Sequence, residues 1–177
     1  MAQSALIVRV PEAEACVGGL RERFDPSARQ GVPAHLTVLY PFMPPELVSG
    51  QVLGGIRQAL LHVAPFDFQL ARVGRFPATT YLAPDPVAPF MDLTRRLVER
   101  FPGYLPYAGE HEGVVPHLTV AHGSAAEAAM AEVELCAAVT GHGPICSTCR
   151  EVVLLENSCG LWREMHVFSL SSGAADK

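Results

Sequence analysis

The tetrapeptide His35-Leu36-Thr37-Val38 occurs a second time as His117-Leu118-Thr119-Val120, 82 residues further along the chain. A Val-Pro pair stands just before each copy, and a helical pattern follows each one. Both copies are best interpreted as β-strands, in which alternate side chains share a face. The histidine and threonine of each copy then point one way, while the leucine and valine point into a core. We therefore expect a polar face of one imidazole and one hydroxyl, presented twice.

Outward from these two copies, the chain alternates between segments with strand and helix patterns. In each half the order is helix, motif strand, helix, strand, strand, and the first half adds one strand in front. This order indicates a coarse internal duplication. The patterns predict strands at 5–10, 34–40, 66–73, 79–83, 114–122, 151–156 and 161–170, and helices at 11–24, 46–63, 90–101 and 125–139.

A proline-rich connection, with Pro84, Pro86 and Pro89, is the candidate boundary between two lobes. We expect one bilobal domain over residues 1–177, with lobe one at about 1–84, lobe two at about 85–170 and a frayed polar tail at 171–177. Two pseudo-equivalent lobes would bring the two motif strands to a shared cleft.

The bulk composition is that of a packed globular protein, with 49% hydrophobic and 18% charged residues. A net charge of −5 argues against binding to duplex DNA, although a pocket for a nucleotide or a short RNA needs only a few local donors. The N-terminus does not have the pattern of a signal peptide, and no apolar run is long enough to span a bilayer. Five cysteines, an odd number, favour reduced thiols and a cytoplasmic protein. We also expect the protein to be a monomer.

Two imidazoles that face one cleft can divide acid and base duties. One takes a proton from the attacking nucleophile, and the other delivers a proton to the leaving oxygen. The two threonine hydroxyls can donate hydrogen bonds to phosphate oxygens and stabilise charge in the transition state. This scheme needs no metal and no cofactor, and the sequence lacks the carboxylate clusters of a hydrolytic magnesium site. The motifs therefore predict phosphoester cleavage or transfer.

The sequence resembles the 2H phosphoesterase superfamily, in its 2′-5′ RNA ligase-like or LigT-like branch. Both His-Leu-Thr motifs carry the resemblance, and the stretch from Gly31 to Phe42 is especially similar to that branch. The resemblance implies an α+β, bilobal LigT-like fold with antiparallel sheets lining a central cleft and helices outside. It implies metal-independent action on 2′,3′-cyclic phosphate ends or 2′-5′ phosphodiester linkages of RNA or small nucleotides. It also makes His35 and His117 catalytic and lets Thr37 and Thr119 bind phosphate. We prefer His35 as the base and His117 as the acid, and the sequence alone leaves the opposite order open.

One position departs from the family pattern. Many RNA cyclic phosphodiesterases of the family carry an arginine three residues after the second motif's threonine, where this chain has His122. His122 could supply a proton-dependent donor to phosphate, or Arg163 could replace the missing guanidinium. Four aromatic residues are further candidates for the substrate site, because they could stack on a base: Tyr40, Phe42, Tyr81 and Trp162.

Two other classes of function stay open from the sequence. A nucleotide- or RNA-end-binding module could keep the same fold and motifs without turnover. A metal protein could use His35, His117 and His122 as ligands. A zinc site at Cys146 and Cys149 is less favoured, because the Cys-x₂-Cys spacing supplies only half of such a site.

Overall fold

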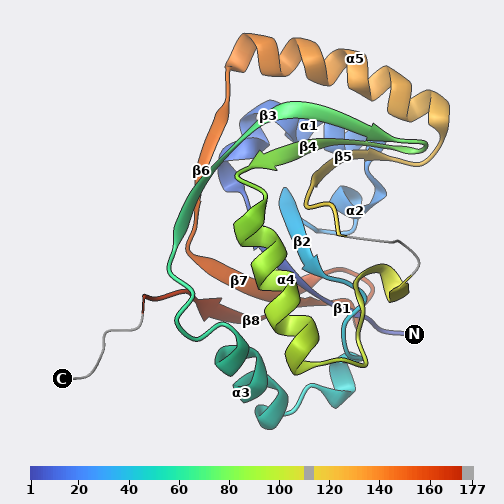
Figure 1. The fold of residues 1–177 in the computed structure, drawn as a ribbon. Helices are drawn as coiled ribbons and strands as arrows, with labels where there is room; N and C mark the ends of the chain where they lie inside the picture. The colour runs from blue at the N-terminus through green and yellow to red at the C-terminus, as the bar shows by residue number, and fades with distance from the viewer. Residues whose placement is uncertain (110–113, 173–177) are drawn as a thin grey trace.

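A computed structural model gives the fold, and it describes residues 1–109 and 114–172 (Figure 1). Its centre is a curled antiparallel sheet of eight strands in the order β6-β3-β4-β5-β2-β1-β7-β8. The strands are β1 Ser4–Arg9, β2 His35–Leu39, β3 Phe66–Phe76, β4 Thr79–Asp85, β5 Leu118–His122, β6 Ile145–Cys149, β7 Glu151–Glu156 and β8 Arg163–Ser169. The α-helices are α1 Glu14–Phe24, α2 Pro26–Arg29, α3 Gly50–Ala59, α4 Ala88–Arg100 and α5 Ala125–His142, and the 3₁₀ turns are η1 Pro11–Ala13, η2 Pro45–Leu47 and η3 Pro106–Gly109.

The sheet has two halves of four strands, β6-β3-β4-β5 and β2-β1-β7-β8, which meet where β5 pairs with β2. Helices α1 and α5 pack together over the first half, and α3 and α4 lie with the second (Figure 1). The predicted α+β class with antiparallel strands and outer helices is confirmed. The division near residue 84 stays a prediction about domains, and the strand pairing crosses it, because β1 pairs with β7 and β3 pairs with β6.

Alternate residues of the strands separate two hydrophobic clusters on opposite faces of the sheet. On β1, Leu6 and Val8 belong to the main core under the helices, whereas Ala5 and Ile7 belong to a second, smaller cluster. The motif strands follow the same rule, since Leu36 and Leu118 are fully buried and the flanking histidines and threonines are only partly buried. The predicted faces of both motifs are thus confirmed.

Three differences between the predicted elements and the structure stand out. Strand β6 was not predicted, because its sequence Ile-Cys-Ser-Thr-Cys is too polar to show a strand pattern. It forms a strand because it pairs with β3. The single helix predicted at 46–63 is wrong: it is a 3₁₀ turn followed by α3, which begins after Ser49, whose hydroxyl accepts from the Val52 amide. The second motif strand begins at Leu118 rather than at residue 114, because Pro116 has no N–H for a ladder.

Candidate active site

The two motif strands pair with each other at the centre of the sheet. Leu36 of β2 lies opposite Leu118 of β5 in an antiparallel register. Side chains on either side of a buried strand residue project from the opposite face. His35 and Thr37 of the first motif and His117 and Thr119 of the second therefore leave the core on the same face of the sheet, where all four line one cavity.

Both histidines make the same backbone hydrogen bond. His35 Nδ1 lies 2.8 Å from the carbonyl oxygen of Pro33, and His117 Nδ1 lies 2.6 Å from that of Val115. A carbonyl oxygen only accepts, so in each ring Nδ1 carries the proton and donates it. The neutral ring then keeps its lone pair on Nε2. The local sequence thus fixes one tautomer in both motifs, with the same nitrogen left for chemistry.

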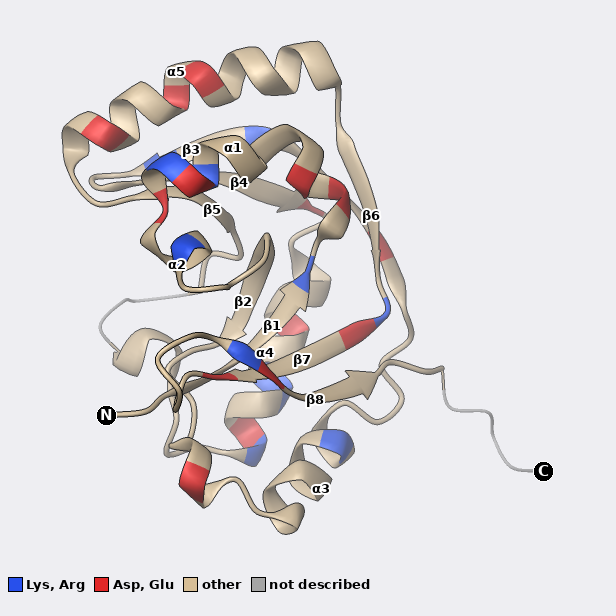
Figure 2. Cartoon of the chain, turned by 180° about the vertical axis from the view of Figure 1, so that it is seen from behind, with Lys and Arg blue, Asp and Glu red and all other residues tan. Residues whose placement is uncertain are grey.

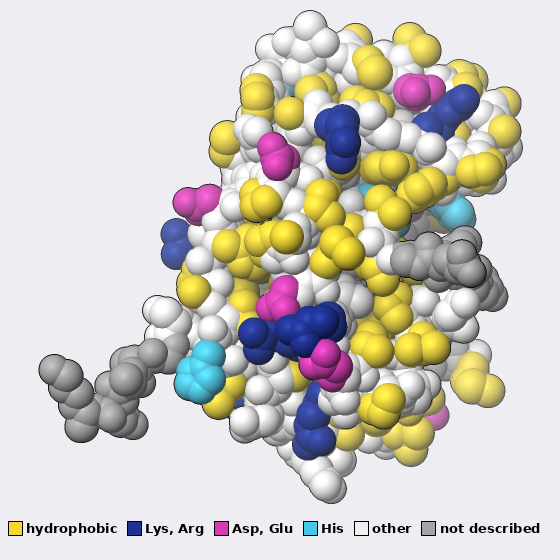
Figure 3. Space-filling view, in the orientation of Figure 1, with side chains coloured by type: hydrophobic (Ala, Val, Ile, Leu, Met, Phe, Trp, Pro, Cys, Tyr) yellow, Lys and Arg dark blue, Asp and Glu magenta, His cyan; other side chains and the backbone are white. Residues whose placement is uncertain are grey.

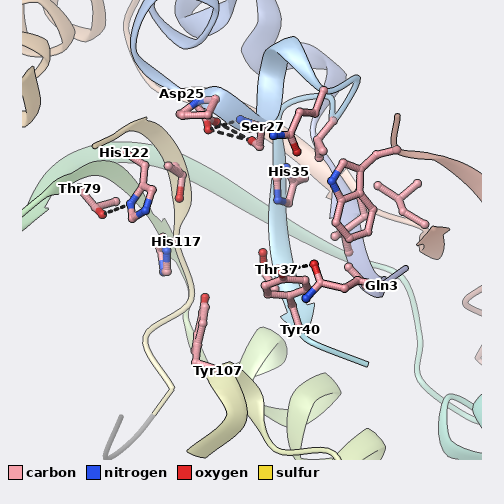
Figure 4. Close-up of a pocket in the computed structure, with 18 of the residues that line it drawn as sticks. Gln3, Asp25, Ser27, His35, Thr37, Tyr40, Thr79, Tyr107, His117 and His122 are labelled. Carbon is pink, nitrogen blue, oxygen red and sulfur yellow. Dashed lines mark hydrogen bonds between the residues drawn. The ribbon is translucent and has the colours of Figure 1, made fainter. Parts of the chain in front are cut away.

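These side chains line a cavity of about 910 Å³, which opens on the face opposite the main core (Figure 4). In Figure 4, His117 and His122 lie on one side of the cavity and His35, Thr37 and Tyr40 on the other. The residues predicted for the site that line it are His35, Thr37, Tyr40, His117, Thr119, His122 and Trp162.

Burial perturbs both motif histidines. Loss of solvent is the main reason that the pKa of His35 falls to about 4, and the charges of Arg21 and His117 act in the same direction. Burial also lowers the pKa of His117 below its ordinary value, but the shift is smaller than that of His35. Both rings are therefore largely neutral near pH 7 when the cavity holds no anion, and the two rings interact electrostatically.

A third imidazole lies beside the second motif. His122 Nδ1 is 2.8 Å from the hydroxyl of Thr79, the residue opposite it in the β4–β5 pair, and both line the cavity. Its charged form acts on His117, because it lowers the pKa of that ring. Among the described residues, no lysine or arginine lines the cavity.

Three residues predicted for the substrate site lie outside the cavity lining. Phe42 is buried in the main core, with ring centroids 5.3 Å from Phe101 and 5.2 Å from Tyr104. Tyr81 stands behind His117, with a centroid distance of 5.2 Å. Arg163 points away and forms an ion pair with Glu156. Arg163 therefore does not replace the family's arginine in this structure.

Tyr107 enters the site from the η3 turn and was not singled out from the sequence. Its ring lies parallel to that of His117, with centroids 6.3 Å apart, and its phenol extends toward the cavity in Figure 4. Its amide donates to the Tyr40 carbonyl at 2.6 Å, and its φ of 52° is left-handed. A tyrosine in an irregular loop with such a backbone gives no periodic signal, so sequence patterns could not find it.

A buried charge cluster supports the loop before the first motif. The Arg21 guanidinium, 2% exposed, bonds Asp25 Oδ2 at 2.9 Å and the Val32 carbonyl oxygen at 3.1 Å. Asp25 in turn accepts hydrogen bonds from the amide and hydroxyl of Ser27. Asp25 and Ser27 line the cavity, so this cluster fixes the wall behind His35.

The histidines do not gather with acidic or thiol groups as metal ligands do. Among residues 1–109 and 114–172, no cluster of three or more His, Cys, Asp or Glu side chains could hold a metal ion. Cys146 is exposed and Cys149 is buried, so the Cys-x₂-Cys pair of β6 does not converge on one point.

The family of the chain follows from a comparison with protein-family models. The model of the 2′-5′ RNA ligase superfamily matches residues 9–160, which include both motifs. The chain belongs to the 2′-5′ RNA ligase superfamily. The resemblance to LigT-like 2H phosphoesterases seen in the sequence is thereby confirmed.

Individual proteins resemble this chain in sequence or in fold. A Bacillus cytotoxicus protein named "Putative phosphoesterase Bcer98_0945" is 32% identical over 103 residues, which is 58% of this chain and 59% of that protein. Escherichia coli LigT complexed with 3′-AMP shares the fold with a TM-score of 0.59 and 16% identity, over 96% of this chain and 98% of LigT. TT0787 of Thermus thermophilus gives a TM-score of 0.60 and 16% identity, over 97% and 100% of the two chains.

In the part of the chain that the structure describes, no helix combines the length and the apolar character needed to cross a bilayer.

Proposed function

We propose that the protein is a metal-independent phosphoesterase that acts on 2′,3′-cyclic phosphate ends or 2′-5′ phosphodiester linkages of RNA or small nucleotides. The observation that carries this proposal is the pairing of the two motifs across β2 and β5, where each histidine uses Nδ1 for its backbone bond and, among the described residues, Nε2 has no backbone partner in the shared cavity. Two imidazoles of the same tautomer on opposite sides of one phosphorus atom suit an in-line displacement.

The difference between the two histidines supports an order of roles. His35 has the more strongly lowered pKa, so it is neutral and takes the proton from the attacking water. The water oxygen forms a bond to phosphorus while the bond to one ribose oxygen breaks. His117, protonated when the anionic substrate is bound, donates its Nε2 proton to that leaving oxygen. The reverse direction, ligation, exchanges the two roles.

Neutral donors hold the phosphate in this scheme. Thr37 and Thr119 donate to non-bridging oxygens, since both line the cavity that holds the two motif histidines. His122, which Thr79 orients, adds a third imidazole where the family has an arginine. One phosphate that carries one charge is well matched to hydroxyls and imidazoles, whereas several phosphates would lack cations among the described lining residues.

The charge on the outer surface also favours a small substrate. Lys and Arg are interspersed with Asp and Glu over the chain, and Figure 3 shows basic side chains next to acidic ones (Figures 2 and 3). On α4, Arg95 and Arg96 both pair with Asp92. A long RNA needs a continuous basic track, so a nucleotide or a short RNA end fits better. Structures of Escherichia coli LigT are complexed with 3′-AMP, NADP+ and ATP, which supports a nucleotide in the corresponding cavity here.

A panel assay in chelator tests the proposal. Nucleoside 2′,3′-cyclic phosphates, 2′-5′ dinucleotides and 3′-5′ dinucleotides are incubated with the full chain in excess EDTA. We expect turnover of the first or second class and none of the third. Binding of these compounds without turnover would instead indicate a binding module, and activity that needs an added divalent ion would indicate a metal protein.

A further inference from the structure

The cavity extends beyond the two motifs to an end that carries no catalytic group. In sheet order, β1 and β7 lie on the side of β2 away from β5. Ile7, Val32 and Leu155, from the smaller hydrophobic cluster, form the floor of this end. Its walls are the two aromatic rings Tyr40 and Trp162 and the two amide side chains Gln3 and Asn157. An apolar floor with aromatic and amide walls suits a planar heterocycle rather than a phosphate.

Trp162 is held firmly beside this floor. Its amide donates to the Gln30 carbonyl at 2.8 Å, and its own carbonyl oxygen lies 3.1 Å from where a Cβ of Gly31 would be. Gly31 has a φ of +90°, so a glycine suits both the backbone and the close approach. The Tyr40 ring meets the indole edge to face, with centroids 6.0 Å apart. The two rings form a rigid aromatic corner.

The hydrogen bonds of Gln3 and Asn157 determine which way their amides face. Asn157 Oδ1 accepts the Gln3 backbone N–H at 2.7 Å, and Gln3 Oε1 accepts the Tyr40 hydroxyl at 2.9 Å (Figure 4). Both carbonyl oxygens are thus occupied, and each side chain presents its NH₂ group elsewhere. Among the described residues neither NH₂ group donates to a protein acceptor, and both side chains line the cavity.

We propose that this end of the cavity is a nucleobase subsite in which Trp162 stacks on the base, while Gln3 and Asn157 donate to an edge that carries two adjacent acceptors. The proposal deepens the proposed function, because it names the base that accompanies the reacting phosphate. Cytosine offers O2 beside N3, and guanine offers O6 beside N7. Adenine sets its amino donor beside N1 and beside N7, so one NH₂ group of the protein would face another donor. The subsite selects cytidine and guanosine nucleotides over adenosine nucleotides.

The discrimination should be measurable by binding alone. Trp162 is the single tryptophan of the chain, so its fluorescence reports directly on this subsite. Titration with cytidine, guanosine and adenosine 3′-monophosphates should change that fluorescence. An unpaired donor against the adenine amino group costs at least about 1.4 kcal/mol, so we expect the adenosine nucleotide to bind ~10-fold or more weakly.

Two variants reverse the donors and keep the structural bonds. Asn157→Asp keeps the oxygen that accepts from the Gln3 amide, and Gln3→Glu keeps the oxygen that accepts from Tyr40. Each change replaces an NH₂ donor by an acceptor, so the preference for cytidine and guanosine over adenosine should fall from ~10-fold to about one. Gln30→Glu is the matched control, because it adds the same charge at the exposed rim of the cavity. It should weaken the binding of all three nucleotides without changing the ratio of their affinities.

The outcomes separate this inference from the proposed function. Equal affinities for the three bases, a ratio that Asn157→Asp and Gln3→Glu leave unchanged, or binding that does not alter the fluorescence of Trp162 would each overturn the subsite. Base discrimination without any turnover would leave the subsite standing and contradict the phosphoesterase. Turnover of all cyclic nucleotides at equal kcat/KM would support the phosphoesterase and contradict the subsite.

Discussion

Gly74 of β3 lies directly opposite Tyr81 of β4, and the Tyr81 ring fills the space that a Cβ at position 74 would need. A Cβ there would be 2.4 Å from the ring, which also lies against the ring of His117 at a centroid distance of 5.2 Å. The glycine therefore lets a tyrosine lie flat across the strand and support a motif histidine from behind. This contact assigns Tyr81 a supporting position, whereas the sequence predicted it to touch substrate.

Gly74→Ala should accordingly displace Tyr81 and misplace His117. Overpacking of this kind costs about 1–3 kcal/mol of unfolding free energy, and a small misplacement of a reacting group can cost up to ~100-fold in rate. Urea unfolding and kcat on a cyclic nucleotide measure the two effects. Gly54→Ala in α3 is the control, because no described atom beyond the neighbouring backbone of its own helix lies within 4 Å of the place its methyl group would take, and it should stabilise the helix by up to about 1 kcal/mol.

The pH dependence of kcat/KM should peak on the acidic side of the ordinary imidazole pKa. His35 must be unprotonated as the base, so activity rises as the pH passes through about 4. His117 must be protonated as the acid, and because burial lowers its pKa, activity falls before the pH reaches its usual 6.5. A profile of kcat/KM against pH should be bell-shaped between these limits. A plateau that extends above pH 8 would be inconsistent with this assignment of roles.

The motif threonines should contribute to catalysis only through their hydroxyl groups. Thr37→Val and Thr119→Val keep the shape and the strand preference of the side chain, so the fold should persist. Loss of one donor to a transition-state oxygen should lower kcat/KM by about 10²–10³-fold in each variant. Thr148→Val on β6 is the control, since its hydroxyl donates to Asp67 and is absent from the cavity lining. A motif valine variant with unchanged activity would remove that threonine from the scheme.

The buried pair Arg21–Asp25 should contribute to stability far more than exposed pairs do. Asp25→Ala leaves the Arg21 guanidinium buried without its carboxylate and should cost about 3–5 kcal/mol in urea unfolding. Asp92→Ala removes the partner of the half-exposed Arg95 and Arg96 on α4 and should cost no more than about 1 kcal/mol per pair. Equal losses in the two variants would show that the cluster behind His35 is not stabilised by its charges.

The sequence was sufficient for the parts of the site that repeat a strand pattern. The alternation around Leu36 and Leu118 predicted which side chains leave the core, and the duplication predicted that the two polar faces meet. The strand order could not be predicted in this way. Pairing of β1 with β7 and of β3 with β6 joins distant stretches of the chain, and no local pattern encodes it.

The aromatic residues show a second limit of sequence analysis. Phe42 was predicted to stack on substrate, but Phe101 and Tyr104, far along the chain, enclose it in the core. Tyr107 and the Gln3–Asn157 pair were missed, because their places depend on a left-handed turn and on the register of β1 against β7. Whether a polar or aromatic side chain meets a cavity is thus decided by tertiary contacts.

The most direct test of paired imidazole catalysis is the kcat of His35→Gln, His117→Gln and the double variant on a nucleoside 2′,3′-cyclic phosphate in EDTA. Because the two rings act in one step, each single change should lower kcat by about 10²–10⁴-fold, and the double variant should be little worse than the worse single. Losses that multiply in the double variant, or a single variant with near-normal kcat, would contradict the account.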